Sequence, residues 1–155
     1  ILVYLVIAFE FNSLILPLII VFSIFLAISG GIIGLFVTQT PISFLGIMGM
    51  VSLTGIVVRN AIVLIDFIEL RRKDGSVNDI YQAIYESGRA RFKPIILTTV
   101  TSILALVPVA LSGDVLFEPL AVTVIAGLAF STLLSMIATP ALYYFYYKFR
   151  YGKEK

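Results

Sequence analysis

The feature that most constrains this chain is a long stretch without charge: no Asp, Glu, Lys or Arg occurs from Phe11 to Val58. One transmembrane helix needs about 20 apolar residues, so this stretch must hold two spans with a turn between them. The polar residues 38–41 mark that turn. Only 13% of the whole chain is charged, against about 25% in a typical soluble domain. The composition therefore predicts an integral membrane protein and excludes a soluble enzyme.

The same reasoning along the rest of the chain predicts an all-α membrane protein, a polytopic transmembrane helix bundle. Ser76 and Asp79 resemble a capping box and Gly88 fits a C-cap, which predicts a short amphipathic helix on the membrane surface. Because the chain opens on Ile1 inside an apolar segment, we expect 1–155 to be a single-domain fragment of a longer protein. The predicted segments are the end of a truncated helix at 1–10, spans at 14–37, 42–70, 92–111 and 119–147, the surface helix at 76–88 and a tail at 148–155.

The basic residues are concentrated at one side of these spans. Of 11 Lys and Arg residues, six lie between Arg71 and Lys93 and four between Lys148 and Lys155. By the positive-inside rule these loops and the C-terminus are cytoplasmic. The clusters flank helix ends without any nucleic-acid-binding module, so nucleic acid is not expected as a partner, whereas the lipid bilayer is.

Two residue types that often carry chemistry are absent. Without cysteine the chain has no disulfide or thiolate chemistry, and without histidine any proton transfer near neutral pH must rest on carboxylates. No nucleophile–base pair, phosphate loop or metal-ligand spacing occurs either. We therefore expect neither an enzyme nor a bound metal.

The remaining basic residue, Arg59, lies inside the apolar segment Gly46–Leu70. An arginine at membrane depth costs roughly 2.5–3.5 kcal/mol on insertion scales and marks a functional site by default. Asp66 lies two turns away, about 10 Å along the axis, which is too far for a direct pair. Asp66 and Glu69 are instead expected as interfacial charges. Helical geometry places the following residues within about 120° of one face: Gly49, Ser52, Gly55, Arg59, Val63 and Asp66.

The next span, 92–111, is unusually polar in its first half. Thr98, Thr99, Thr101 and Ser102 follow one another closely, and Arg91 shares a face with Thr98 and Ser102. Hydroxyls in membrane helices commonly donate to their own backbone carbonyls, and Arg91 alone fits an interfacial anchor. The residues by themselves leave this structural interpretation and a functional one open. Elsewhere, small residues repeat three to four apart, which predicts close helix packing: Ser23, Ala27, Gly30, Gly31 and Gly34, and later Gly127, Ser131, Ser135 and Thr139.

Three segments together resemble the C-terminal end of a resistance-nodulation-division (RND) transporter, in its hydrophobe/amphiphile efflux (AcrB-like) branch. They are GIVVRNAIVLIDFIELRRKDG, RARFKPIILTTVTSILALVPVAL and EPLAVTVIAGLAFSTLLSMIATPALYY. The resemblance covers essentially the whole chain, from the end of the eighth helix through the twelfth helix of the family. It implies a proton-driven efflux transporter in the inner (plasma) membrane, with the proton motive force as energy source and no cofactor.

The resemblance also implies which residues act in the proton relay. The family's lysine–asparagine motif of the tenth helix falls on Arg59 and Asn60, and the basic residue and threonine of its eleventh helix fall on Arg91 and Thr98. Asp66 and Ser102 are secondary candidates. Arg59 departs from the family's lysine, and because arginine essentially never loses its proton, it can act only as a permanent cation.

The implied mechanism needs parts that lie outside this chain. Two aspartates of the family's fourth helix would hold Arg59 in an ion pair, and their protonation from the outer side would release it. Large extramembrane domains bind the substrate, so no substrate-binding residue is expected in this chain. The family forms a homotrimer that works with a periplasmic adaptor and an outer-membrane channel.

Other functions remain compatible with such a bundle. RND relatives export lipids, metals or proteins, although the chain has only three methionines, Met48, Met50 and Met136, and no cluster suited to a metal conduit. A membrane scaffold or sensor is a further alternative. A scaffold has no need of Arg59, so its replacement by leucine separates these readings.

Overall fold

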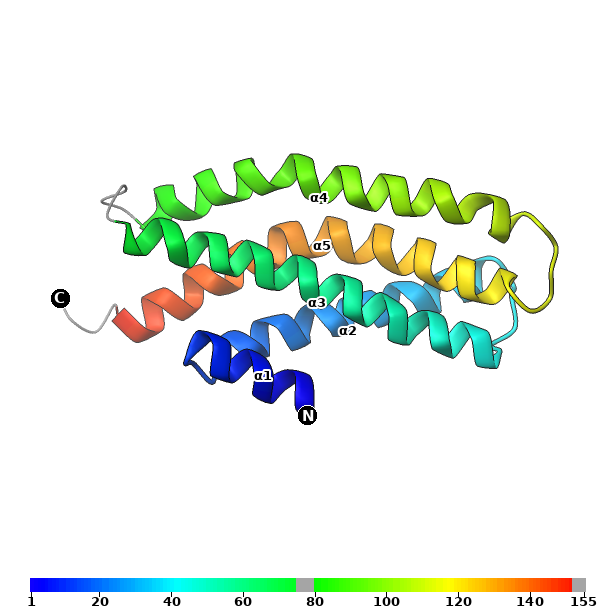
Figure 1. The fold of residues 1–155 in the computed structure, drawn as a ribbon, viewed down its shortest axis with the longest axis horizontal. Helices are drawn as coiled ribbons and strands as arrows, with labels where there is room; N and C mark the ends of the chain where they lie inside the picture. The colour runs from blue at the N-terminus through cyan, green and yellow to red at the C-terminus, as the bar shows by residue number, and fades with distance from the viewer. Residues whose placement is uncertain (75–79, 152–155) are drawn as a thin grey trace.

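The computed structural model describes residues 1–74 and 80–151, which form a bundle of five helices without strands in this part of the chain (Figure 1). The predicted all-α bundle is therefore confirmed. Four helices are long and apolar enough to cross a membrane, as expected from the distribution of charge. The helices are α1 (Leu2–Phe11), α2 (Leu16–Val37), α3 (Phe44–Lys73), α4 (Ile80–Ala110) and α5 (Glu118–Tyr151).

The first turn of the chain is built by short polar residues. Asn12 ends α1 in the left-handed conformation, with φ of 45°, a conformation that asparagine tolerates better than most residues. The buried Ser13 hydroxyl then lies 3.3 Å from the Tyr146 hydroxyl of α5. Pro17 stands in the first turn of α2, where its missing N–H costs no hydrogen bond. This turn therefore fixes the start of α2 against the end of α5.

The centre of the bundle is the close packing of α2 on α5. A Cβ at Gly31 would lie 3.1 Å from Thr123, and a Cβ at Gly34 would collide with the side chain of Ala126. Ser23, Ala27 and Gly30 on the same face of α2 are buried as well. These glycines allow the two backbones to approach closely, which confirms the packing stripe predicted in α2.

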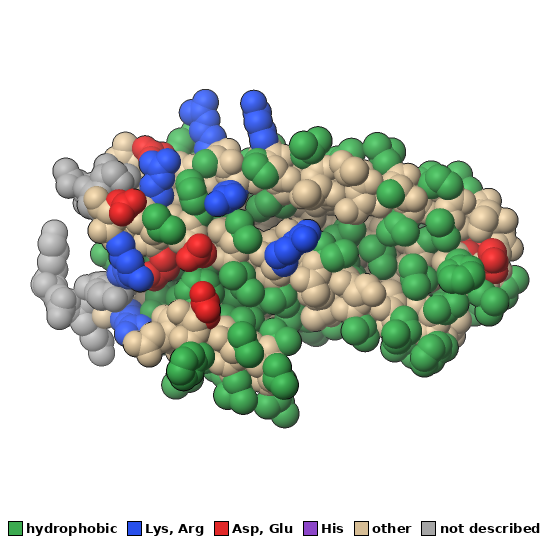
Figure 2. Space-filling model, in the orientation of Figure 1, with side chains coloured by type: hydrophobic (Ala, Val, Ile, Leu, Met, Phe, Trp, Pro, Cys, Tyr) green, Lys and Arg blue, Asp and Glu red, His purple; other side chains and the backbone are tan. Residues whose placement is uncertain are grey.

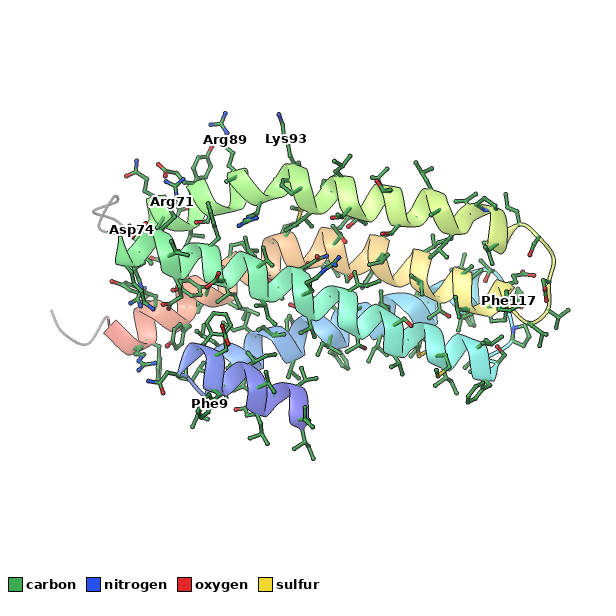
Figure 3. The ribbon with its side chains drawn as sticks, viewed as in Figure 1. Phe9, Arg71, Asp74, Arg89, Lys93 and Phe117 are labelled. Carbon is green, nitrogen blue, oxygen red and sulfur yellow. The ribbon has the colours of Figure 1, made fainter. Side chains whose placement is uncertain are left out.

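The helix α4 differs from the sequence prediction. We predicted a surface helix at 76–88, a break near Gly88, and a separate span from 92; instead one helix runs unbroken through Ile80–Ala110. The predicted cap at 76–79 lies outside the described residues. Pro94 inside α4 removes one backbone hydrogen bond without ending the helix. The axis of α4 changes direction close to Lys93, the residue before that proline (Figure 3).

The connections between spans gather at two ends of the bundle. Ser43 caps α3 by accepting a hydrogen bond from the Gly46 backbone N–H at 3.1 Å. The loop at 38–41 lines a small cavity together with Val115 from the loop before α5 and Glu118 at the start of α5. These two loops, which contain no Lys or Arg, therefore lie side by side. Figure 2 shows most basic side chains at the opposite end, and the chain thus has one basic and one non-basic end.

Candidate functional site

The face of α3 that carries Arg59 is open in this chain. Ser52, Gly55, Arg59 and Asp66 are exposed, and a Cβ added at Gly55 would meet no atom within 4 Å. The opposite face of α3 is buried against the bundle through Leu53, Val57, Ala61, Leu64, Ile65 and Ile68. The predicted face therefore exists, except that Gly49 is buried against α5, 3.1 Å from the Leu120 carbonyl as measured to an added Cβ. α3 packs through its apolar side and presents its polar side outward.

Arg59 and Asn60 have no partner within the described residues. No hydrogen bond, ion pair or ring contact involves the guanidinium of Arg59, and the half-buried amide of Asn60 makes no side-chain hydrogen bond. The adjacent residues Val57, Val58 and Ala61 offer only apolar side chains. Arg59 is thus a cation in the middle of an apolar helix with unused hydrogen-bond donors.

The hydroxyls of α4 are satisfied by their own helix. Thr98 is exposed and donates to the carbonyls of Pro94 at 2.7 Å and Ile95 at 3.0 Å. Thr101 and Ser102 donate in the same way to residues 97 and 98, at 2.7 Å and 2.8 Å. Thr99 is the exception, because it is buried and its hydroxyl lies 3.1 Å from that of Thr132 on α5. In this chain the exposed hydroxyls of α4 therefore act structurally, by donating to carbonyls of their own helix. No hydrogen bond joins Thr98 to Arg59.

Arg91 connects α4 to α3 through an aromatic ring that the sequence analysis did not single out. Its guanidinium lies 4.6 Å from the centre of the Phe67 ring, and the guanidinium of Arg71 lies 5.4 Å from the same centre. The Nε of Arg91 is buried and has no hydrogen-bond partner in the described part of the chain. A guanidinium over a ring face is stabilised by the ring quadrupole. Phe67 is thus a platform that holds two cations at the junction of α3 and α4.

These contacts set the register of the antiparallel pair α3 and α4. Arg91 lies beside Phe67, and nearer the basic end Arg71 pairs with Glu86 at 3.0 Å. Seven residues from Arg91 toward the non-basic end is Thr98, and seven residues from Phe67 in the same direction is Asn60. Both steps cover about 10 Å along a helix. Thr98 therefore lies at nearly the same depth as Arg59 and Asn60, and Arg91 lies about two turns closer to the basic end.

The acidic residues near the end of α3 behave differently from each other. Glu69 accepts hydrogen bonds from Arg72 at 3.2 Å and from the Tyr143 hydroxyl of α5 at 3.1 Å, and Lys73 lies 3.5 Å away. Glu69 is thus paired with the basic residues that end α3, and it also ties α3 to α5. Asp66 is exposed and has no ion pair within the described residues. The contact of Glu69 with Tyr143 spans 74 positions in sequence, and no local pattern indicates it.

Comparison with known proteins identifies the relatives of this chain. The profile of the AcrB/AcrD/AcrF family matches residues 1–147. The swarming motility protein SwrC of Bacillus subtilis is 39% identical over 155 residues, and the multidrug resistance protein MdtC of Erwinia amylovora is 36% identical over 152 residues. These matches cover 97% and 96% of this chain but only 14% and 15% of the relatives, so the chain spans about one seventh of their length.

A solved structure shows the same arrangement of helices. The crystal structure of a heavy metal efflux pump superposes with a TM-score of 0.80 at 28% identity, over 92% of this chain and 14% of the pump. A second crystal form of a heavy metal efflux pump gives a TM-score of 0.75 at 30% identity. With the profile match over nearly its whole length, the chain belongs to the AcrB/AcrD/AcrF family of the RND superfamily and is part of a multi-pass membrane protein.

Proposed function

We propose that this chain is the C-terminal membrane part of a proton-driven efflux transporter and supplies the cationic half of its proton-coupling site. The observation that carries the proposal is Arg59, a guanidinium in mid-span, on an open helix face, without a partner among the described residues. Leaving such a charge unpaired in a membrane is costly. The acidic partner is therefore supplied by another part of the complete protein that packs on this face.

The proposed coupling is electrostatic. Carboxylates that approach Arg59 have their pKa lowered by the cation and raised by desolvation, so their proton affinity depends on whether the pair is formed. Because Arg59 remains charged, protonation of the acids, and not deprotonation of the base, breaks the pair. Thr98, at the same depth on α4, then exchanges its backbone acceptors for the released groups, and the helices repack.

Arg91 has a different place in this scheme. It lies about two turns nearer the basic end than Arg59 and rests on Phe67. Arg91 is therefore too far from Arg59 for a direct contact. We assign Arg91 the role of holding α3 and α4 in register; its Nε is buried and makes no hydrogen bond within the described residues. Asp66 and Ser102 stay secondary candidates on the same two helices.

Efflux as the activity follows from the relatives, two of which are named for multidrug resistance and heavy metal efflux. In the complete protein we expect extramembrane domains to carry the substrate site, a homotrimeric assembly, and an adaptor and outer-membrane channel as partners. We expect the proton motive force to drive transport without a bound cofactor, and the protein to reside in the inner membrane. We expect the complete protein to act as a transporter and not as an enzyme.

The alternative substrates differ in what they require of this chain. Within the described residues no group of three or more His, Cys, Asp or Glu is placed to hold a metal ion, so the likeness to a heavy metal pump concerns the helix bundle. A lipid or protein exporter of the same superfamily would share the helix bundle and differ in the central motif that carries Arg59. A non-transporting scaffold would not need Arg59 at all.

The decisive experiment replaces Arg59 in the complete protein. We expect Arg59→Leu to abolish substrate efflux driven by an imposed pH gradient in proteoliposomes, because the acids lose their counter-charge. The variant should insert at normal levels, since leucine removes a cost of roughly 2.5–3.5 kcal/mol at the centre of a span. Arg59→Lys keeps a cation at this position and should retain coupled transport.

The matched control is Lys73→Gln, which removes one positive charge from the exposed end of the same helix. Its transport should equal that of the parent protein. Normal efflux by Arg59→Leu, with normal insertion, would refute the coupling role and leave the scaffold interpretation. Loss of transport in Lys73→Gln to the same degree would show that the effect of Arg59 is not specific to its position.

A further inference from the structure

A large groove lies between α4 and α5 near the basic end of the bundle, on a side that the coupling mechanism does not use. Its volume is about 790 Å³, and its lining includes Tyr85, Arg89, Phe92 and Lys93 from α4 and Pro140 and Tyr144 from α5. At one end the rings of Tyr81 and Tyr144 meet edge to face, with centroids 5.9 Å apart. The walls are therefore largely aromatic and aliphatic.

The charge of this groove is one-sided. Arg89 and Lys93 stand one turn apart on α4 and extend outward from the bundle (Figure 3). Neither makes an ion pair or hydrogen bond within the described residues, and none of the residues lining the groove is acidic. The nearby Glu86 is already paired with Arg71 at 3.0 Å. Two free cations thus border an apolar groove, which favours a ligand with an anionic head and an apolar body.

The depth of the groove matches that of a lipid headgroup. Beyond Lys93 toward the non-basic end, α4 exposes only apolar and hydroxyl side chains, including Leu97, Val100 and Leu104. Before Arg89, the exposed side chains of α4 are polar or aromatic, with Tyr81, Gln82 and Tyr85. Tyrosine is enriched where a span meets the membrane–water interface. The two cations therefore lie at the border between hydrocarbon and water.

We propose that this groove is a binding site for an anionic phospholipid of the leaflet at the basic end. The phosphate contacts Arg89 and Lys93, because a guanidinium forms paired hydrogen bonds with phosphate oxygens and an ammonium adds a point charge. The upper part of an acyl chain lies on Phe92 and Pro140. Basic pockets between membrane helices on the cytoplasmic side are suited to such headgroups. The site depends on the membrane location of the chain and not on proton coupling.

The test measures lipid binding to the purified complete protein by native mass spectrometry, with phosphatidylglycerol and phosphatidylcholine as probes. We expect the double variant Arg89→Gln, Lys93→Gln to bind phosphatidylglycerol about thirtyfold more weakly, from the loss of two basic contacts. Phosphatidylcholine should bind weakly to the parent and the variant alike. The matched control is the double variant Lys73→Gln, Lys148→Gln, which removes the same charge from the same end outside the groove and should bind like the parent.

Two further measurements distinguish a bound lipid from a free anion and from another occupant of the groove. Ala141 of α5 also lines the groove. Ala141→Trp fills the groove while keeping both cations, so it should weaken phosphatidylglycerol binding, whereas inorganic phosphate at millimolar concentration should not displace the lipid. Unchanged binding in the Arg89, Lys93 variant would overturn the proposal and indicate that another segment covers the groove. Equal weakening in the control, or displacement by phosphate, would overturn it as well. Arg59→Leu should bind the lipid normally, so failure of the coupling proposal would be seen separately.

Discussion

At the scale of single residues, two threonines of α4 provide a matched pair. Thr98 and Thr101 are both exposed and both donate to a backbone carbonyl four residues earlier, each at 2.7 Å. Only Thr98 lies on the face shared with Arg91 and level with Asn60. Thr98 has in addition a hydrogen bond to the Ile95 carbonyl at 3.0 Å, but both hydroxyls are satisfied by their own helix, so a large difference in transport between the variants reports on position.

We therefore predict different results for the two alanine variants in proton-driven transport. Thr98→Ala should reduce transport strongly, because a hydroxyl is lost at the proposed coupling depth, while Thr101→Ala should transport like the parent. Both should change the free energy of unfolding by no more than about 0.5 kcal/mol, as expected for exposed positions. The measurements are efflux in proteoliposomes and thermal unfolding in detergent. Equal transport by the two variants would contradict a role for Thr98.

At the scale of helices, the number of long apolar helices follows from the sequence, because membrane length and charge placement are local properties. The absence of charge from Phe11 to Val58 led to two helices, and the structure has α2 and α3 there. The predicted break near Gly88 is wrong, because a glycine suits a C-cap but does not by itself end a helix. A glycine costs only about 1 kcal/mol in a helix, and membrane helices tolerate proline when neighbouring groups satisfy the freed carbonyl.

The contacts between helices are harder to predict from the sequence than the helices themselves. The placement of Arg59 on a polar face follows from helical periodicity alone, and the structure agrees. The stacking of Arg91 on Phe67, and the bond between Glu69 and Tyr143, depend on the relative rotation and register of separate helices. Those quantities come from packing along the whole bundle, and no residue spacing within one helix contains them. The positions of the candidate residues along their own helices therefore follow from the sequence, but their mutual geometry does not.

The close packing of α2 on α5 predicts that alanine has different effects on stability at two glycines. A Cβ at Gly34 would collide with Ala126, whereas a Cβ at Gly88 of α4 would meet nothing within 4 Å. We expect Gly34→Ala to lower the free energy of unfolding by about 1–3 kcal/mol through overpacking. Gly88→Ala should be neutral or stabilising by up to about 1 kcal/mol, since alanine favours the helix. Thermal unfolding of the two purified variants measures the difference, and equal melting temperatures would contradict this interface.

At the scale of the whole molecule, the chain is asymmetric in two directions. Along the helices, basic residues gather at one end and the two loops without Lys or Arg meet at the other (Figure 2). Across the helices, α3 buries its apolar side and leaves the side with Arg59 open. The first asymmetry orients the bundle in a membrane, and the second leaves a polar surface that needs a counterpart. Both are consistent with a chain that spans about one seventh of its relatives.

The first asymmetry can be tested directly, because the chain contains no cysteine. In a cysteine-free background of the complete protein, single cysteines replace Gln39 and Val115 at the non-basic end, and Lys73 and Lys148 at the basic end. All four positions are exposed. By the positive-inside rule, a thiol reagent that cannot cross the membrane should label Cys at 39 and 115 in intact spheroplasts. It should label those at 73 and 148 only after the membrane is permeabilised, because the same rule predicts that the basic end faces the cytoplasm. Labelling of all four positions in intact spheroplasts would contradict both the orientation and the leaflet assigned to the lipid groove.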